Sequence, residues 1–188
     1  MITIRPLKGE DKDQIVRILR ERRVFPEHEM KVAIEVLDDA LRFPERGDYQ
    51  TFCAVGEQGD LAGYICFGLI PITDAAYDLY WIAVSTHYGR QGVGGALVKH
   101  MEHLARSQGA RQIYIETSSL PAFEQARTFY KKNQYELVSI LTDFYKAGDH
   151  KLIFMKNLEP KHPYPARKSV LMPALPRTKD DVSHSKNP

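Results

Sequence analysis

Four glycines lie close to an arginine near the middle of this 188-residue chain, in the stretch His-Tyr-Gly-Arg-Gln-Gly-Val-Gly-Gly at positions 87–95. Residues 79–84 before it are apolar, aromatic and β-branched, which predicts a buried strand. After it, Val93, Leu97 and Leu104 recur at helical spacing. A helix N-terminus carries unpaired N–H groups and about half a positive charge, and glycine lets a ligand come close to the backbone. This strand, turn and helix therefore predict a binding site for phosphate or pyrophosphate.

Other glycine-rich phosphate loops fit this spacing less well. A Walker loop requires Lys followed by Ser or Thr after its second glycine, and no such pair follows these glycines. A dinucleotide fingerprint requires G-x-G-x-x-G, and Leu97 stands where its third glycine would be. A dinucleotide-binding protein nevertheless stays an alternative, because Glu116 falls at the end of the next predicted strand. That alternative predicts a parallel sheet before Gly92.

The stretch from Gly89 to Gly94 resembles the acetyl-CoA motif of the GCN5-related N-acetyltransferase (GNAT) family, Arg/Gln-x-x-Gly-x-Gly/Ala. It matches at Gly92 and Gly94 and departs at its first position, which is Gly89. The resemblance implies acetyl-CoA as co-substrate, with its pyrophosphate on the turn and its pantetheine alongside the preceding strand. The residues implied are Ile82, Ala83, Val84, Gly89, Arg90, Gln91, Gly92, Val93, Gly94 and Gly95.

A second family signature is similar to residues 126–135. The family usually shows Ala-x-x-x-Tyr and then Gly-Phe/Tyr, and this chain has Ala126, Tyr130 and Gln134-Tyr135. Tyr130 matches the family position that protonates the leaving thiolate and contacts the cofactor. Gln134 in place of the usual glycine is a departure from the pattern.

Acetyl transfer to an amine also needs a group that takes up a proton, because an alkylammonium is mostly protonated at neutral pH. Three carboxylates are candidates, acting directly or through water. Glu116 lies at the end of a predicted strand and is the first candidate; Asp78 and Asp143 follow. A reaction without a dedicated base is also open. We expect catalytic roles for Tyr130, Glu116 and Asp78.

The order of predicted elements is β-α-α-β-β-β-α-β-α-β-β over residues 1–158. Short turns between residues 51 and 84 favour antiparallel strands, and the helix from Gly92 to Ser107 favours a parallel crossover. The order matches the GNAT fold, an α/β (α+β) domain. It implies a mixed, mostly antiparallel sheet of about seven strands with about four helices and a V-shaped splay between the fourth and fifth strands. Residues 159–188 are rich in proline and basic, which predicts a tail.

Charge and hydropathy narrow the class of partner. The net charge is +2, and residues 157–188 hold six Lys/Arg against three Asp/Glu, so the predicted domain is near neutral and no nucleic acid is expected. No long apolar run or signal peptide is visible, which predicts a cytoplasmic protein without a membrane partner. We expect no metal site, because His100 and His103 have no acidic or cysteine partner at suitable spacing.

These observations predict an acetyl-CoA-dependent N-acetyltransferase with direct attack in a ternary complex. The acceptor is a primary amine on a small molecule, amino acid or peptide. The acidic residues along positions 27–39 and a hairpin loop over 146–150 would shape its pocket; the alternative for these acids is a solvated helix face. The resemblance also leaves a homodimer open as the oligomeric state. A non-catalytic acyl-CoA-binding module on the same fold is the other alternative.

Overall fold

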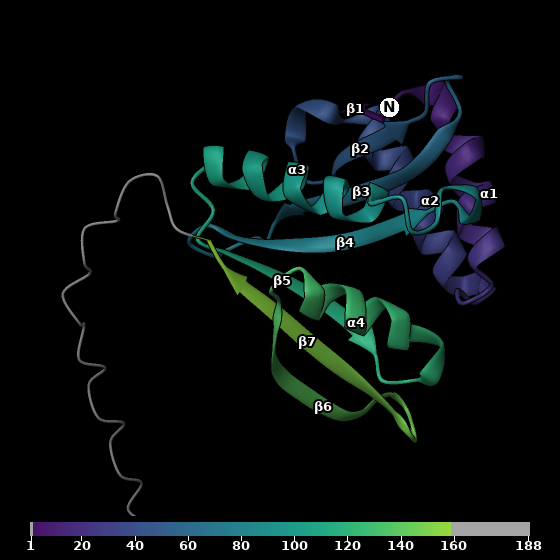
Figure 1. The fold of residues 1–188 in the computed structure, drawn as a ribbon. Helices are drawn as coiled ribbons and strands as arrows, with labels where there is room; N and C mark the ends of the chain where they lie inside the picture. The colour runs from purple at the N-terminus through teal and green to yellow at the C-terminus, as the bar shows by residue number, and fades with distance from the viewer. Residues whose placement is uncertain (1, 159–188) are drawn as a thin grey trace, which may run out of the picture.

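The computed structural model describes residues 2–158, which form one seven-stranded sheet with helices on both faces (Figure 1). The strands are β1 (Thr3–Pro6), β2 (Gln50–Val55), β3 (Leu61–Leu69), β4 (Ala76–Val84), β5 (Gln112–Ser118), β6 (Glu136–Lys146) and β7 (Asp149–Asn157). The helices are α1 (Lys12–Arg22), α2 (Glu27–Arg42), α3 (Val93–Ser107) and α4 (Glu124–Lys132). Four 3₁₀ turns join them: η1 (Gly9–Asp11), η2 (Pro44–Arg46), η3 (Thr86–Tyr88) and η4 (Pro121–Phe123). The predicted element order is confirmed, and the predicted tail lies outside the described residues.

The strand order is β1-β2-β3-β4-β5-β7-β6, and every neighbouring pair is antiparallel except β4 and β5. The mixed, mostly antiparallel sheet is therefore confirmed. The dinucleotide-binding alternative predicted a parallel sheet before Gly92. That prediction is wrong, because β2, β3 and β4 form an antiparallel meander. Short connections such as the turn between β2 and β3 allow only this arrangement.

The parallel pairing of β4 with β5 is short. It runs from Ala76–Gln112 to Leu79–Ile115, whereas β4 continues to Val84 and β5 to Ser118. A shift in register opposite Cys66 and Phe67 inserts Tyr80 as an extra residue in β4, and such bulges bend a strand. The two strands separate beyond this point (Figure 1), which confirms the predicted splay.

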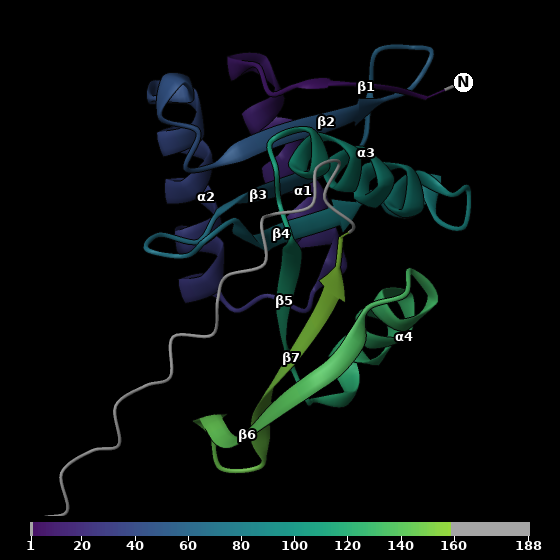
Figure 2. The same ribbon diagram turned by 90° about the vertical axis from the view of Figure 1, so that its left-hand side faces the viewer.

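Two hydrophobic cores lie on opposite faces of the sheet. Helices α3 and α4 cover one face, where Leu97 and Met101 are buried against β3, β4 and β5. Helices α1 and α2 cover the other, where Ile15 and Leu37 are buried (Figure 2). Because both faces of the central strand β3 are covered, eight of its nine residues are buried, and its sequence is almost continuously apolar.

Small differences from the predicted boundaries have local causes. Leu120-Pro121 is a sequence typical of a helix start, but Pro121 starts a 3₁₀ turn and helix α4 begins at Glu124. The predicted hairpin loop 146–150 is shorter than expected, because Lys146 pairs with Asp149 and leaves a two-residue turn with Gly148 at φ +79°. None of the helices within residues 2–158 has the length and apolar character needed to span a lipid bilayer.

Candidate active site

The turn before α3 presents backbone N–H groups at its surface. Gly92 precedes the helix with φ +80°, a left-handed conformation that glycine adopts without strain. Five N–H groups of this turn make no hydrogen bond to another atom of residues 2–158: those of Arg90, Gly92, Val93, Gly94 and Gly95. The N–H groups of Gly89 and Gln91 are not free, because they donate to the carbonyl oxygens of Thr86 and Tyr88 within the turn. The turn can therefore offer several donors to an anion.

The structure gives different reasons for a glycine at each position of this turn. A Cβ on Gly94 would lie 3.2 Å from the Phe129 ring, so this glycine lets α4 pack closely on α3. A Cβ on Gly95 would meet nothing within 4 Å, and its backbone is not left-handed. Packing and conformation thus explain Gly92 and Gly94 but leave Gly95 without a structural reason, in open space beside the free N–H groups.

The end of β4 leads from this turn toward the separation of the strands. Ile82, Ala83 and Val84 pair with β3 on one side and not with β5 on the other. Their backbone edge toward β5 is therefore outside the sheet ladder. Val84 packs into the core on the α3 face together with Phe129, which places this edge next to the glycine turn.

Tyr130 lies on the same face, at the point where β4 and β5 separate. Its ring is 5.9 Å from that of Phe154, which pairs with Ile115, the last β5 residue paired with β4. The side chain is buried, and burial raises the pKa of its phenol to about 12. Its hydroxyl makes no hydrogen bond to another described residue. At neutral pH it is therefore a protonated phenol whose O–H is not used by the fold.

Asp78 and Glu116 lie on the opposite face of the sheet, at the same level. Asp78 pairs with Tyr114, and Glu116 follows Ile115, where the ladder ends. Burial raises the pKa of Asp78 to about 6, and the Glu116 carboxylate adds to this rise while Lys151 opposes it. Asp78 makes no hydrogen bond or ion pair within residues 2–158. It is thus a partly buried carboxylate that can take up a proton near neutral pH.

Glu116 has a partner that the sequence analysis did not select. Its Oε2 lies 2.6 Å from the Nζ of Lys151, which is only 14% exposed. Lys151 is the cross-strand neighbour of Ser118, so only the register of β5 against β7 reveals that it faces Glu116. The first candidate for the base is therefore engaged in an ion pair.

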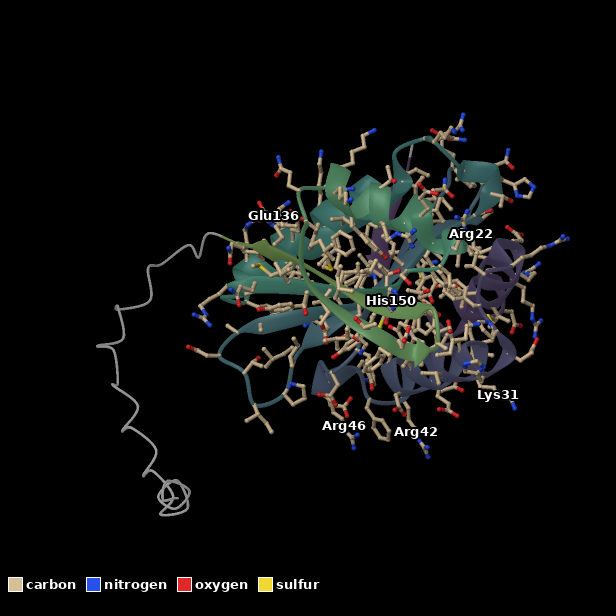
Figure 3. The ribbon with its side chains drawn as sticks, turned by 90° about the horizontal axis from the view of Figure 1, so that it is seen from below. Arg22, Lys31, Arg42, Arg46, Glu136 and His150 are labelled. Atoms are coloured by element: carbon tan, nitrogen blue, oxygen red, sulfur yellow. The ribbon has the colours of Figure 1, made fainter. Side chains whose placement is uncertain are left out.

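Asp143 has a structural role in the β6–β7 hairpin. Its Oδ1 accepts a hydrogen bond from the N–H of Gly148, and its own N–H donates to Nδ1 of His150, both at 2.9 Å. His150 lies in the middle of the molecule when it is viewed from below, whereas Lys31 and Arg42 project outward from α2 (Figure 3). The hairpin is near the start of α2, because Asp149 is close enough to Glu29 to add to the rise that burial causes in the pKa of that carboxyl.

An aromatic bridge spans the two diverging halves of the sheet. The Phe25 ring, between α1 and α2, meets two other rings edge-on. Its centre lies 5.3 Å from that of Trp81 in β4 and 6.3 Å from that of Phe123 in η4. Arg22 donates a hydrogen bond to Gln125 across the same gap. The segment between α1 and α2 thus connects the two halves of the sheet, and the sequence analysis did not identify this role.

The chain matches known proteins along most of its described length. The model of the acetyltransferase (GNAT) family matches residues 13–135. An uncharacterized N-acetyltransferase of Bacillus subtilis, YsnE, is 26% identical over 110 residues, which is 58% of this chain and 70% of that protein. A putative GNAT acetyltransferase from Desulfovibrio desulfuricans has a TM-score of 0.80 and 32% identity, over 84% of this chain and 99% of that one.

A third similarity concerns the fold alone. The PaiA N-acetyltransferase of Thermoplasma acidophilum, solved in complex with coenzyme A, has a TM-score of 0.68 at 19% identity, over 84% of this chain and 99% of that one. The sheet topology, the glycine turn and these matches agree with one another. The chain belongs to the GNAT family of N-acetyltransferases.

Proposed function

We propose that this protein transfers an acetyl group from acetyl-CoA to a primary amine of a small molecule, amino acid or peptide by direct attack in a ternary complex. One observation carries the proposal: the pairing of β4 with β5 ends at Leu79–Ile115. At that level Tyr130 lies on one face of the sheet, and Asp78 lies on the other. A thioester placed between the separating strands would have a proton donor and a proton acceptor on opposite sides.

The residues present suit coenzyme A. The free N–H groups at the start of α3 and the exposed Arg90 would bind the pyrophosphate. The open edge of Ile82, Ala83 and Val84 would pair with the amide groups of the pantetheine arm. The co-substrate supplies an activated acetyl group. The complex of the related fold with coenzyme A supports this assignment.

Two side chains would move protons in the reaction. Asp78 receives the proton of the acceptor ammonium, because its carboxylate is unpaired and its pKa of about 6 lies close to neutral pH. Tyr130 donates its phenolic proton to the leaving thiolate, since its hydroxyl has no other partner among residues 2–158. An unpaired N–H of β4 polarises the carbonyl as negative charge develops on its oxygen.

The charge around Asp78 favours a cationic amine as acceptor. Glu116 is neutralised by Lys151, which leaves Asp78 with an uncompensated negative charge. Glu29, at the start of α2, adds a carboxylate on the same side near Tyr145. A protonated amine would be attracted to this region before it gives up its proton.

Calorimetric titration of the purified protein with acetyl-CoA tests the first half of the proposal, with CoA, NAD and ATP as comparisons. We expect saturable binding of acetyl-CoA at one site, followed by release of free thiol when a panel of primary amines is added. Binding of acetyl-CoA without thiol release from any amine would favour a non-catalytic acyl-CoA-binding module. Absence of binding would overturn the assignment of the glycine turn.

A further inference from the structure

The ammonium of Lys151, on β7, is surrounded by groups from two other strands. Its Nζ lies 2.6 Å from Glu116 of β5 and 3.9 Å from the centre of the Phe144 ring of β6, with the Tyr145 ring at 5.9 Å. A cation over an aromatic face is attracted to the ring quadrupole, and the effect strengthens when water is excluded. A half-exposed phenylalanine on an edge strand thus has a definite partner, the charge of Lys151.

The hairpin turn sets the position of Phe144. Asp143, immediately before it, has a left-handed backbone with φ +53°, and the register between β6 and β7 shifts between Leu141 and Lys146. The hydrogen bonds of Asp143 with Gly148 and His150 hold this irregular segment. An irregularity in a strand redirects the side chains that follow it. The bent segment therefore brings Phe144 over Lys151.

The surroundings of Asp78 show what this arrangement changes. The ionisable groups near Asp78 are Tyr80 on its own strand, Glu116 on β5 and Lys151 on β7. Tyr145 of β6 approaches Glu116 rather than Asp78. Two neighbouring carboxylates cannot both ionise easily, because each raises the other's affinity for a proton. Lys151 reduces this conflict, because it pairs with Glu116 and its positive charge opposes the rise in the pKa of Asp78.

We propose that Lys151 is a positioning residue of the acceptor site: paired with Glu116 and covered by Phe144, it leaves Asp78 as the one carboxylate at the end of the β4–β5 ladder that is free to receive the acceptor's proton. The inference rests on the proposed role of Asp78 in acetyl transfer. The electrostatic part concerns only the chain's own residues, so it can be tested without any substrate.

The experiment is an NMR titration of side-chain carboxyl carbons in the full-length protein without ligand, with Asp78→Asn identifying the Asp78 signal. We expect Lys151→Met to raise the titration midpoint of Asp78 by about one pH unit, because the positive charge that lowers the pKa of Asp78 is lost and Glu116 stays unpaired. Glu116→Gln lowers the midpoint, and the double variant Lys151→Met/Glu116→Gln lies between the two single variants. Lys151→Arg keeps the wild-type midpoint. Lys132→Met, which removes an exposed lysine on the other face, changes nothing.

Two results would overturn the proposal. The first is an Asp78 midpoint that is unchanged in Lys151→Met; if that variant does not fold, an unchanged midpoint in Glu116→Gln decides in the same way. The second is an Asp78 titration midpoint that moves as expected in these variants while the acid limb of their pH profile of kcat/KM stays where it is in the wild type. Failure of acetyl-CoA binding in calorimetry would count against the proposed function instead, because the titration does not depend on it.

Discussion

The two faces of the diverging strands are built from different parts of the chain. On the α3 face, the candidate cofactor site consists of the free backbone N–H groups of one continuous turn, those of Arg90 and of Gly92 to Gly95. On the α1–α2 face, the candidate acceptor site consists of side chains from β4, β5, β6 and β7, which are distant in sequence. A backbone site depends on the free space and the charge beside its N–H groups, whereas a charge cluster depends on each of its charged side chains.

Asp78→Asn gives the largest effect we expect, because it removes the proton acceptor. We expect kcat/KM for an acceptor amine to fall by about 10²- to 10⁴-fold while acetyl-CoA affinity is unchanged. In the wild type, activity should decline as pH falls below about 6, where Asp78 becomes protonated. Initial rates of thiol release against pH measure both effects.

Asp13→Asn serves as the control, since it removes an exposed carboxylate in the first turn of α1. Its activity should equal that of the wild type. An Asp78→Asn enzyme with a normal rate and an unchanged acid limb would show that the proton leaves by another route.

Gly95→Asp tests the site on the α3 face, which is made of backbone N–H groups. The new side chain would enter open space, so the fold should be kept, but its carboxylate would lie beside the donors that we assign to the pyrophosphate. We expect acetyl-CoA affinity to fall by about 10- to 100-fold, equal to about 1.4–2.8 kcal/mol. Calorimetry measures the affinity. Gly9→Asp, where a Cβ also meets nothing within 4 Å, should bind acetyl-CoA normally; equal affinities in the two variants would remove the turn from the binding site.

Tyr130→Phe tests the proton donor between the two faces. We expect kcat to fall about tenfold, because water can supply the proton less efficiently. The free energy of unfolding should change by less than about 0.5 kcal/mol, because the Tyr130 hydroxyl has no partner within residues 2–158. Since burial raises its pKa to about 12, Tyr130 should cause no loss of wild-type activity up to about pH 10.

The matched control is Tyr77→Phe, which removes a buried hydroxyl that donates to Gln108 at 2.9 Å. This variant should lose stability and keep kcat. The opposite pattern in the two variants would contradict a catalytic role for Tyr130.

The sequence predicted the fold and the backbone half of the site better than the side-chain half. Element order follows from hydrophobic periodicity, and the glycine turn is local, so the prediction of its free N–H groups needed only the neighbouring residues. The partner of Glu116 could not be predicted in this way. Lys151 reaches it because Ser118 and Lys151 are paired, and a shift of one residue would have placed the ammonium on the other face. The role of Asp143 in its turn likewise depends on three-dimensional hydrogen bonds.

The smallest effect we expect is the change that Asp78→Asn causes in the free energy of unfolding. Its dependence on pH distinguishes Asp78 from a carboxylate that stabilises the fold. The pKa of Asp78 is about 6 in the folded state and near 4 in the unfolded chain, so the folded state binds the proton more tightly. Its contribution to stability is therefore favourable below about pH 4 and is lost as pH rises to about 6. At pH 8 we expect Asp78→Asn to be more stable than wild type by about 1 kcal/mol, discounted because the group is partly exposed.

Asp11 should show the reverse dependence. It is buried, and hydrogen bonds from Arg5 and the N–H of Lys8 outweigh the effect of burial and lower its pKa, so its contribution to stability is present at neutral pH and is lost in acid. Asp11→Asn should cost about 3 kcal/mol at pH 8 and less at low pH. Urea unfolding of both variants at pH 4, 6 and 8 measures this. If Asp78→Asn also destabilises the protein at pH 8, the Asp78 carboxylate is part of the structural framework rather than a charge that the fold holds at a cost for the reaction.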